Sequence, residues 1–250
     1  MSEVQALETA SYATWTPDVS EIVAGWHVTA TDGLSRRVNS ARAIGEAAVD
    51  DDSRNLLERW FSSRNLPLVV RETPLMSEGT SRAVRNLWQF KAIDETLVMS
   101  NRSRKVPARG VRTVSIRNGT FQAELAALNG CSKADAETLK RLYARVSKKG
   151  VGVWIPGRAV AVVVRYRDAA GVFSVAVAEE HKQAGLGRRI MDAASTWASN
   201  KGIRDTFVQV LRTNEPAVEL YRHLGFTERY RYRYLQPDRS GMDTTLNGDQ

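Results

Sequence analysis

Hydrophobic residues alternate with smaller or polar residues between Val172 and Val177. This period of two places Phe173, Val175 and Val177 on one face and predicts a strand with one buried side. Beyond a charged turn, apolar residues recur every three or four positions: Ile190, Met191, Ala194, Trp197 and Ala198. That spacing predicts an amphipathic helix. The turn between the two contains Gly-Leu-Gly at residues 185–187, so the stretch is predicted to be strand, glycine turn and helix.

The start of this predicted helix is suited to an anion. Its first N–H groups have no partner inside the helix, and the helix dipole adds positive character there. Glycines let a phosphate approach the backbone closely, and Lys182, Arg188 and Arg189 flank the turn. A plain connector has the same pattern, and two well-known phosphate fingerprints are absent. The sequence has no G-x-x-x-x-G-K-S/T pattern, and G-x-G-x-x-G is incomplete because Ile190 stands where the third glycine is needed. The turn alone leaves both interpretations open.

A second strand and helix follow the first pair. Residues 207–211 (Phe-Val-Gln-Val-Leu) predict a strand, and Asn214, Glu215 and Pro216 are typical of a helix start. Gly225 stands where a glycine would end that helix. The apolar stripe of the helix consists of Ala217, Leu220, Tyr221 and Leu224.

From residue 159 to 235 the chain resembles the GNAT superfamily of acyl-CoA-dependent N-acyltransferases. The family pattern at the turn, Arg/Gln-x-x-Gly-x-Gly/Ala, is similar to residues 182–187 (Lys-Gln-Ala-Gly-Leu-Gly). A second family block is matched by Asn214, Tyr221, Gly225 and Phe226. Lys182 departs from the family's Arg or Gln, which keeps a charge but loses a planar donor fork. The resemblance implies an α/β (α+β) fold with a mixed, mostly antiparallel sheet flanked by helices.

The resemblance also implies a co-substrate and residues that would bind it. Acetyl-CoA or a related acyl-CoA would donate the acyl group, and no metal is expected. The backbone at Val177 would bind the acyl carbonyl or the pantetheine arm, and Asn214 would contact that arm. Residues 182–188 would hold the pyrophosphate. The expected binding set is Ala176, Val177, Lys182, Gln183, Ala184, Gly185, Leu186, Gly187, Arg188, Asn214, Ala217 and Tyr221.

Catalysis in such an enzyme needs a proton for the departing thiolate and a base for the acceptor ammonium. The resemblance assigns the first role to Tyr221, although an aromatic residue on an apolar stripe also suits a core position. Glu179 and Glu180 follow the central strand and are candidate bases, with a solvated acidic turn as the alternative. His181 is a further candidate because its ordinary pKa lies near neutrality.

The reaction predicted is acyl transfer to an amine of a small molecule or a peptide. The alternative is a non-catalytic acyl-CoA-binding regulatory or scaffold module, which the lysine at the turn and the uncertain base leave open. In the last strand, arginines 229, 231 and 233 alternate with tyrosines 230, 232 and 234. This pattern is typical of a charged edge strand, and it also suits one wall of an acceptor pocket.

The N-terminal half predicts a strand over residues 21–30, a hairpin partner over 36–43 and a helix that begins at the aspartates 50–52. Its order of elements parallels the C-terminal half without the glycine turn, which suggests a tandem GNAT with a degenerate first half. The predicted organisation is a mobile lead (1–18), a degenerate GNAT-like domain (19–105) with a linker at 101–110, a GNAT domain (111–236) and a disordered tail (237–250). His27 is interpreted as structural.

Composition narrows the function classes only slightly. The net charge of +8 suits an anionic ligand, but the positive residues are scattered, which makes a nucleic-acid partner unlikely. The single cysteine, Cys131, excludes an intramolecular disulfide framework. No secretory signal or membrane span is evident, so we expect a cytoplasmic protein. A homodimer is compatible with the sequence.

Overall fold

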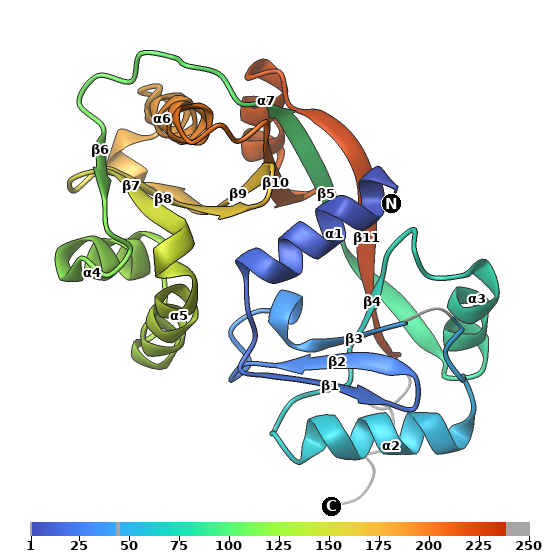
Figure 1. Cartoon of the computed structure of the whole chain (residues 1–250). Coiled ribbons are helices and arrows are strands. Elements are labelled where there is room, and N and C mark those ends of the chain that lie inside the picture. Colours follow the sequence, from blue (N-terminus) through green and yellow to red (C-terminus); the bar gives the residue numbers. More distant parts are fainter. Residues whose placement is uncertain (1, 44–45, 239–250) are drawn as a thin grey trace, which may run out of the picture. The chain divides into compact units, whose positions relative to one another are not determined.

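The computed structural model describes residues 2–43 and 46–238, and these fall into two compact units (Figure 1). Unit 1 contains residues 1–16 and 96–231, and unit 2 contains residues 17–95 and the chain from 232 onward. Two long strands, β5 (Phe90–Arg102) and β11 (Thr227–Pro237), contribute residues to both units. The boundary therefore differs from the predicted division at residues 105–111, because the chain passes between the units inside strands and not in a linker.

The sheet of unit 1 has the order β11-β5-β10-β9-β8-β7-β6. Its remaining strands are β6 (Arg112–Val114), β7 (Gly150–Ile155), β8 (Ala159–Tyr166), β9 (Ala169–Val177) and β10 (Asp205–Leu211). The pairs β6–β7, β7–β8, β8–β9 and β5–β10 are antiparallel, and β9–β10 is parallel. This confirms the predicted mixed, mostly antiparallel sheet.

Helices cover both faces of this sheet (Figure 1). The helices of unit 1 are α1 (Glu3–Thr14), α4 (Gly119–Leu128), α5 (Lys133–Val146), α6 (Leu186–Asn200) and α7 (Glu215–His223), with short 3-10 turns η2 (Ser147–Lys149) and η3 (Glu179–His181). Ile190 and Ala194 of α6 pack in one core with Val153 of β7. The neighbouring Gly152 faces the other way, because a Cβ there would meet Phe121 of α4. Thus α6 and α4 lie on opposite faces.

Unit 2 is smaller and contains a second strand–helix–strand unit. Its elements are β1 (Val19–Val23), β2 (Trp26–Ala30), η1 (Arg36–Val38), β3 (Ser40–Ala43), α2 (Asp51–Ser62), β4 (Val70–Glu72) and α3 (Glu78–Asn86). The strands β3 and β4 pair in parallel on either side of α2, as β9 and β10 do on either side of α6. Residues 233–235 of β11 pair with β4. The core contains Trp26, Leu57, Phe61, Val84, Trp88 and Leu235.

The single strand predicted over residues 21–30 is two strands joined by a tight turn. Val23 pairs with Trp26, and both turn residues have positive φ, 49° at Ala24 and 80° at Gly25. Such a turn matches the twist of a hairpin. The expected partner at 36–43 begins as η1 and becomes β3 only at Ser40, which pairs with Thr29 of β2.

The expected mobile lead is an ordered helix. Ser2 caps α1 by accepting a hydrogen bond from the Gln5 N–H, and Leu7, Ala10 and Thr14 are buried. The expected linker at 101–110 is also ordered along α6. The Ser195 and Thr196 hydroxyls each donate to and accept from the backbone of this segment, at Arg104 and Val106 respectively. The tail expected to be disordered lies almost entirely outside the described residues.

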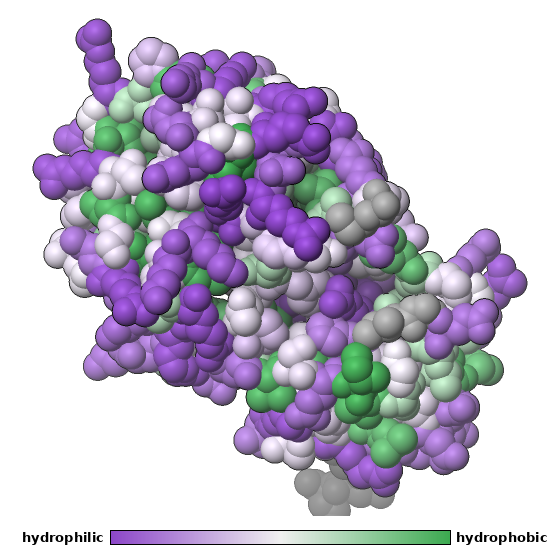
Figure 2. Space-filling model, in the orientation of Figure 1, coloured by the Kyte–Doolittle hydropathy of each residue, from purple (hydrophilic) through white to green (hydrophobic). Residues whose placement is uncertain are grey.

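Most of the face shown in Figure 2 is hydrophilic, as expected for the surface of a globular protein. Within residues 2–43 and 46–238, no helix combines the length and the apolar character needed to cross a bilayer.

Candidate functional site

The strands β9 and β10 part in the middle of the unit 1 sheet. Their parallel register begins at Asp205↔Ala169 and ends at Phe207↔Gly171, although β9 continues to Val177 and β10 to Leu211. On its other edge β10 remains paired to β5 as far as Leu211. Beyond residues 171 and 207 the backbone edges of β9 and β10 no longer pair with each other, which makes them a candidate position for a ligand.

The direction of one N–H group supports this interpretation. Ala178 donates its N–H to the carbonyl of Arg158, on the β8 side of the strand. Because successive N–H groups of an extended chain point to opposite edges, the N–H of Val177 points toward the gap left by β10. The N–H of Ala176, one residue earlier, is directed toward β8.

The N-terminus of α6 lies just beyond the end of β9 and is open. Its cap residue, Gly185, has φ 72°, and no side chain caps the helix or places an acid in its first turn. A Cβ added to Gly185 would meet nothing within 4 Å. The backbone of this turn, including Gln183 at φ 62° and the exposed Ala184, can therefore present N–H groups to a phosphate.

Basic side chains surround this helix start. Lys182 is half exposed and forms an ion pair with Glu179 three residues earlier. The guanidinium of Arg188 lies 3.8 Å from the carboxylate of Asp192, one turn further along α6. The pair of Lys182 with Glu179 is exposed and contributes little free energy. The Asp192 carboxylate is largely buried, but the Arg188 side chain is more than half exposed, so a phosphate can reach both cations.

The second glycine of the turn has a different role from the first. A Cβ on Gly187 would lie 2.9 Å from Cδ2 of Leu220 and 4.0 Å from Cγ2 of Val177. Gly187 thus lets the start of α6 pack against both α7 and the end of β9. The buried Leu186 and the partly buried Ala217 belong to the same hydrophobic core, so the three elements of the predicted site do come together.

Tyr221 lies in this core on α7, and its ring packs against Phe226 at 5.8 Å. Only 6% of the residue is exposed, and burial raises the pKa of its hydroxyl to about 12. The phenol is therefore protonated at neutral pH, as a proton donor must be. This position is compatible with both interpretations of Tyr221, as a core residue and as a proton donor.

Asn214 begins α7 as predicted. Its side-chain oxygen accepts a hydrogen bond from the Ala217 N–H at 3.3 Å, and Pro216 occupies the first turn. Gly225, at φ 83°, follows the end of the helix. Asn214 therefore has a structural role in starting α7, and the residue is exposed.

The two candidate bases lie in the exposed turn η3. Glu179 has 82% of its side chain exposed and is paired with Lys182, and Glu180 is also exposed. His181 is partly exposed in the same turn. This placement agrees with a solvated acidic turn as readily as with a catalytic role.

Sequence reasoning missed an irregularity in β9 near the opening. Ser174 has φ 50°, and the register to β8 shifts between Val160 and Val162. The Ser174 hydroxyl forms a 2.8 Å hydrogen bond with the Tyr143 hydroxyl of α5, and its carbonyl accepts a 3.4 Å bond from Asn129. Tyr143 belongs to the apolar stripe of α5, so periodicity predicts that it is buried but not which strand it meets.

The described part of the chain contains no group of three or more metal-binding side chains. The alternating tyrosines of β11 are all buried, and the arginines between them form ion pairs with glutamates: Arg229 with Glu3, Arg231 with Glu228 and Arg233 with Glu72.

Comparisons with known proteins identify the family. A family model described as "Probable histone acetyltransferase Rv0428c C-terminal" matches residues 1–235. The chain belongs to this family, within the GNAT superfamily. The resemblance found at residues 159–235 is thereby confirmed, and the family match also covers the N-terminal half.

Two relatives found by sequence are described as N-acetyltransferases. The uncharacterized N-acetyltransferase YobR of Bacillus subtilis is 22% identical over 254 residues, covering 94% of this chain and 98% of the relative. The [Ribosomal protein bS18]-alanine N-acetyltransferase of Escherichia coli is 28% identical over 79 residues, covering 32% of this chain and 53% of the relative.

Solved structures confirm the GNAT fold. A GCN5-related N-acetyltransferase from Kribbella flavida has a TM-score of 0.70 at 14% identity and covers 97% of this chain and 99% of its own. A tandem GNAT protein from the clavulanic acid biosynthesis pathway has a TM-score of 0.56 at 14% identity, covering 78% of this chain and 74% of its own.

Proposed function

We propose that this GNAT protein is an N-acyltransferase that moves an acetyl group from acetyl-CoA to an amine. The observation that carries the proposal is the open N-terminus of α6 beside the parted ends of β9 and β10. The helix N-terminus suits a pyrophosphate, and the gap between the two strands suits the pantetheine arm and its thioester. The GNAT relatives are N-acetyltransferases, which supports acyl transfer in general.

Each part of the ligand would meet its own part of the site. The N–H groups at residues 185–188, with Lys182 and Arg188, would hold the pyrophosphate. The Val177 N–H would donate to the thioester carbonyl or the pantetheine arm, alongside Ala176. The start of α7, at Asn214 and Ala217, would border the arm. When bound, acetyl-CoA supplies an activated acyl group.

Tyr221 would act as the general acid in this reaction. Its buried hydroxyl keeps its proton at neutral pH and would donate it to the sulfur as negative charge develops there, while the proton that the attacking nitrogen loses would reprotonate the phenolate. A positioned proton donor of this kind contributes about 10²–10⁴-fold to the rate. The exposed Glu179 and Glu180 remain candidate bases.

We also propose that unit 2 is a degenerate GNAT half. Its β3-α2-β4 arrangement repeats β9-α6-β10, and each is followed by a further helix and a long strand. Aspartates occupy the start of α2, so this half would not bind a second acyl-CoA.

The test compares wild type with Tyr221→Phe in acetyl-CoA binding and in thiol release with a panel of amines. We expect thermal melting to show the same acetyl-CoA shift for both, and turnover to fall by about 10²-fold or more in the variant. Unchanged turnover would remove Tyr221 from the mechanism. Binding without thiol release by wild type, for any amine, would favour the scaffold alternative.

A further inference from the structure

The N-terminal helix α1 lies across the face of the unit 1 sheet opposite α6. In β10, Val208 and Val210 pack in the core of α6, so Gln209 between them points to the other face. There its amide nitrogen donates to the Ser11 hydroxyl of α1 at 2.7 Å. One turn later, Trp15 stacks on Phe173 of β9 with ring centroids 6.0 Å apart.

These two contacts place α1 over the opening between the strands. Gln209 lies two residues beyond Phe207, the last residue of β10 that pairs with β9. Phe173 lies two residues beyond Gly171, its counterpart on β9. The residues of α1 between Ser11 and Trp15 therefore span the point where β9 and β10 have separated.

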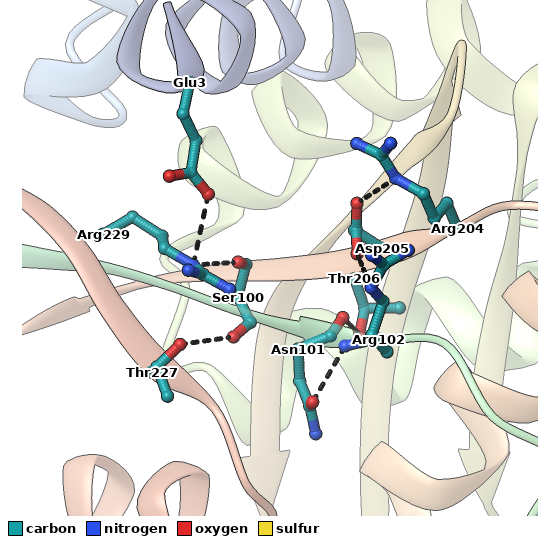
Figure 3. A network of polar contacts seen from close by, with 9 residues as sticks. All are labelled: Glu3, Ser100, Asn101, Arg102, Arg204, Asp205, Thr206, Thr227 and Arg229. Carbon is teal, nitrogen blue, oxygen red and sulfur yellow. Dashed lines mark hydrogen bonds and ion pairs between the residues drawn. The ribbon is translucent and has the colours of Figure 1, made fainter.

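Further contacts hold both ends of α1, the N-terminal end at β11 and β5 and the C-terminal end at α5. The Arg229 guanidinium lies 3.3 Å from the Glu3 carboxylate and donates to the Ser100 hydroxyl at 2.7 Å, as Figure 3 shows. The carbonyl of Thr16, just beyond the helix, accepts a 3.1 Å bond from Arg145. Both ends of α1 are thus held in place by contacts that do not involve the residues in the middle of the helix.

A carboxylate occupies the centre of this docked face. Glu8 is only 2% exposed and accepts a hydrogen bond from the Tyr230 hydroxyl. It lies one helical turn before Ser11, so its Cα is about 5 Å along the helix axis from the residue that contacts Gln209. Burying a carboxylate is costly, and an apolar residue would dock the helix at lower cost. The presence of a buried carboxylate here is what a catalytic role for Glu8 would explain.

We propose that Glu8 binds the ammonium of the acceptor and takes its first proton, in a site that α1 forms with β10 and Tyr230. This inference rests on the proposed acyltransferase function. The carboxylate's two oxygens offer about four acceptor positions, so they can bond an ammonium while keeping Tyr230. Acetyl-CoA and the amine would then approach from opposite faces of the sheet. The phosphates of acetyl-CoA would lie beside the cations of α6, and the ammonium of the acceptor would lie beside Glu8.

The proton balance of the step is closed. The ammonium gives one proton to Glu8 and becomes a neutral amine. The amine nitrogen forms a bond to the thioester carbon, and the carbon–sulfur bond breaks. The sulfur takes the phenolic proton of Tyr221, which is replaced by the second proton of the nitrogen. Glu8 releases its proton to solvent, so one proton is produced for each amide formed.

The test uses the full chain with Glu8→Gln and the matched control Glu3→Gln on the same helix. The probes are acetyl-CoA and four primary amines: alanine amide, an alanine-initiated peptide, a lysine peptide and spermidine. We expect Glu8→Gln to lower kcat/KM for the amine by about 10²-fold or more while the acetyl-CoA melting shift stays at the wild-type value. Glu3→Gln should stay within about twofold of wild type, since an exposed ion pair contributes little.

A second variant covers the case in which Glu8→Gln does not fold. Tyr230→Phe keeps the ring and removes only the hydroxyl that bonds Glu8, and we expect it to raise the KM for the amine. Wild-type transfer rates in Glu8→Gln, or in Tyr230→Phe if only that variant folds, would overturn the assignment and leave the acyltransferase proposal intact. A wild type that binds acetyl-CoA but acetylates none of the four amines would also overturn it. Absence of acetyl-CoA binding by wild type would instead overturn both proposals.

Discussion

The helices α6 and α2 each follow a central strand, yet their N-termini are built in opposite ways. At α6, glycine is the cap residue, and the first turn carries no acid. At α2, Asp50 accepts a hydrogen bond from the Ser53 N–H at 2.8 Å, and Ser53 donates from its hydroxyl back to the Asp50 carbonyl. Asp51 and Asp52 add two further negative charges to that first turn.

The difference shows that a helix N-terminus after a strand can either bind an external anion or be capped by its own carboxylate. The hydrogen bonds from Ser53 hold the pKa of Asp50 below its usual value, so α2 carries its own anion at neutral pH. The α6 terminus has no such internal partner, and its donors remain for an external anion. The open end suits ligand binding, while the filled end stabilises unit 2 and repels phosphate.

The largest effect is expected from making α6 resemble α2. In Gly185→Asp a carboxylate would occupy the position proposed for the pyrophosphate. Wild type at a 100-fold excess of acetyl-CoA over its Kd should gain about 2.7 kcal/mol, or about 5–10 °C in Tm. We expect this gain to be lost in the variant, and thermal melting with and without acetyl-CoA measures it.

Gly202→Asp is the matched control for that substitution. Gly202 follows the other end of the same helix, has a similar φ of 67°, and a Cβ there would also meet nothing within 4 Å. An aspartate there shares the backbone strain and is unfavourable near the negative end of the helix dipole. It should lower the melting temperature yet keep the acetyl-CoA shift. Equal ligand shifts in both variants would contradict the α6 assignment.

A smaller effect separates the two glycines of the turn. Gly187→Leu would drive a side chain into Leu220 and Val177, and overpacking of this kind costs about 1–3 kcal/mol. We expect a lower Tm without ligand. Gly187→Ala is the control, because the end of the Leu220 side chain can move and alanine favours a helix by about 1 kcal/mol over glycine. If Gly187→Leu melts like wild type, the packing role of Gly187 is wrong.

The smallest effect concerns His27 of unit 2, whose two ring nitrogens both have partners within that unit. His27 lies between Ser20, 2.6 Å from its Nε2, and Arg42, whose Nε donates to Nδ1 at 2.8 Å. Burial, and then the charge of Arg42, lower the pKa of His27 to about 4. Between pH 6.5 and 4 the unfolded chain binds the extra proton, so stability should fall as pH falls.

His27→Gln removes this titration. After allowance for solvent screening of a half-buried group, wild type should lose about 1 kcal/mol more than the variant between pH 6.5 and 4. Denaturant titrations at the two pH values measure the difference. Parallel losses would show that another group is responsible.

Periodicity in the sequence was sufficient to predict the elements that bury an apolar face. The strand at 172–177, the helix after it and the Asn214 cap all occur close to their predicted places. The shared face predicted for Phe173, Val175 and Val177 is wrong, because the irregularity at Ser174 leaves Phe173 against Trp15 while the two valines pack in the core of α6. The helix α1 was missed because its docked face includes the buried polar residues Glu8, Ser11 and Thr14, so no apolar stripe marks it. The turn at Ala24 and Gly25 was missed because two small residues continue the alternation of the strands.

The site was predicted where it depends on one local segment and missed where segments far apart meet. Glycines 185 and 187 were found together, but only the packing of α7 shows that they differ in role. The separation of β9 and β10 depends on strand register, which no single strand encodes. The contact of Ser11 with Gln209 joins residues 198 positions apart, and no pattern in either segment predicts it.

The exchange of strand segments at β5 and β11 has a practical consequence for dissecting the protein. All seven residues of β10 pair with residues 96–102 of β5, which precede the C-terminal half as the sequence divides it. A fragment beginning at residue 111 would expose this entire edge, and an unpaired edge strand invites aggregation. A fragment ending at residue 105 would in turn lack the β11 partner of β4. Neither half can therefore be produced as a continuous fragment with all its strand partners. The contribution of each half is better measured by point substitutions in the intact chain.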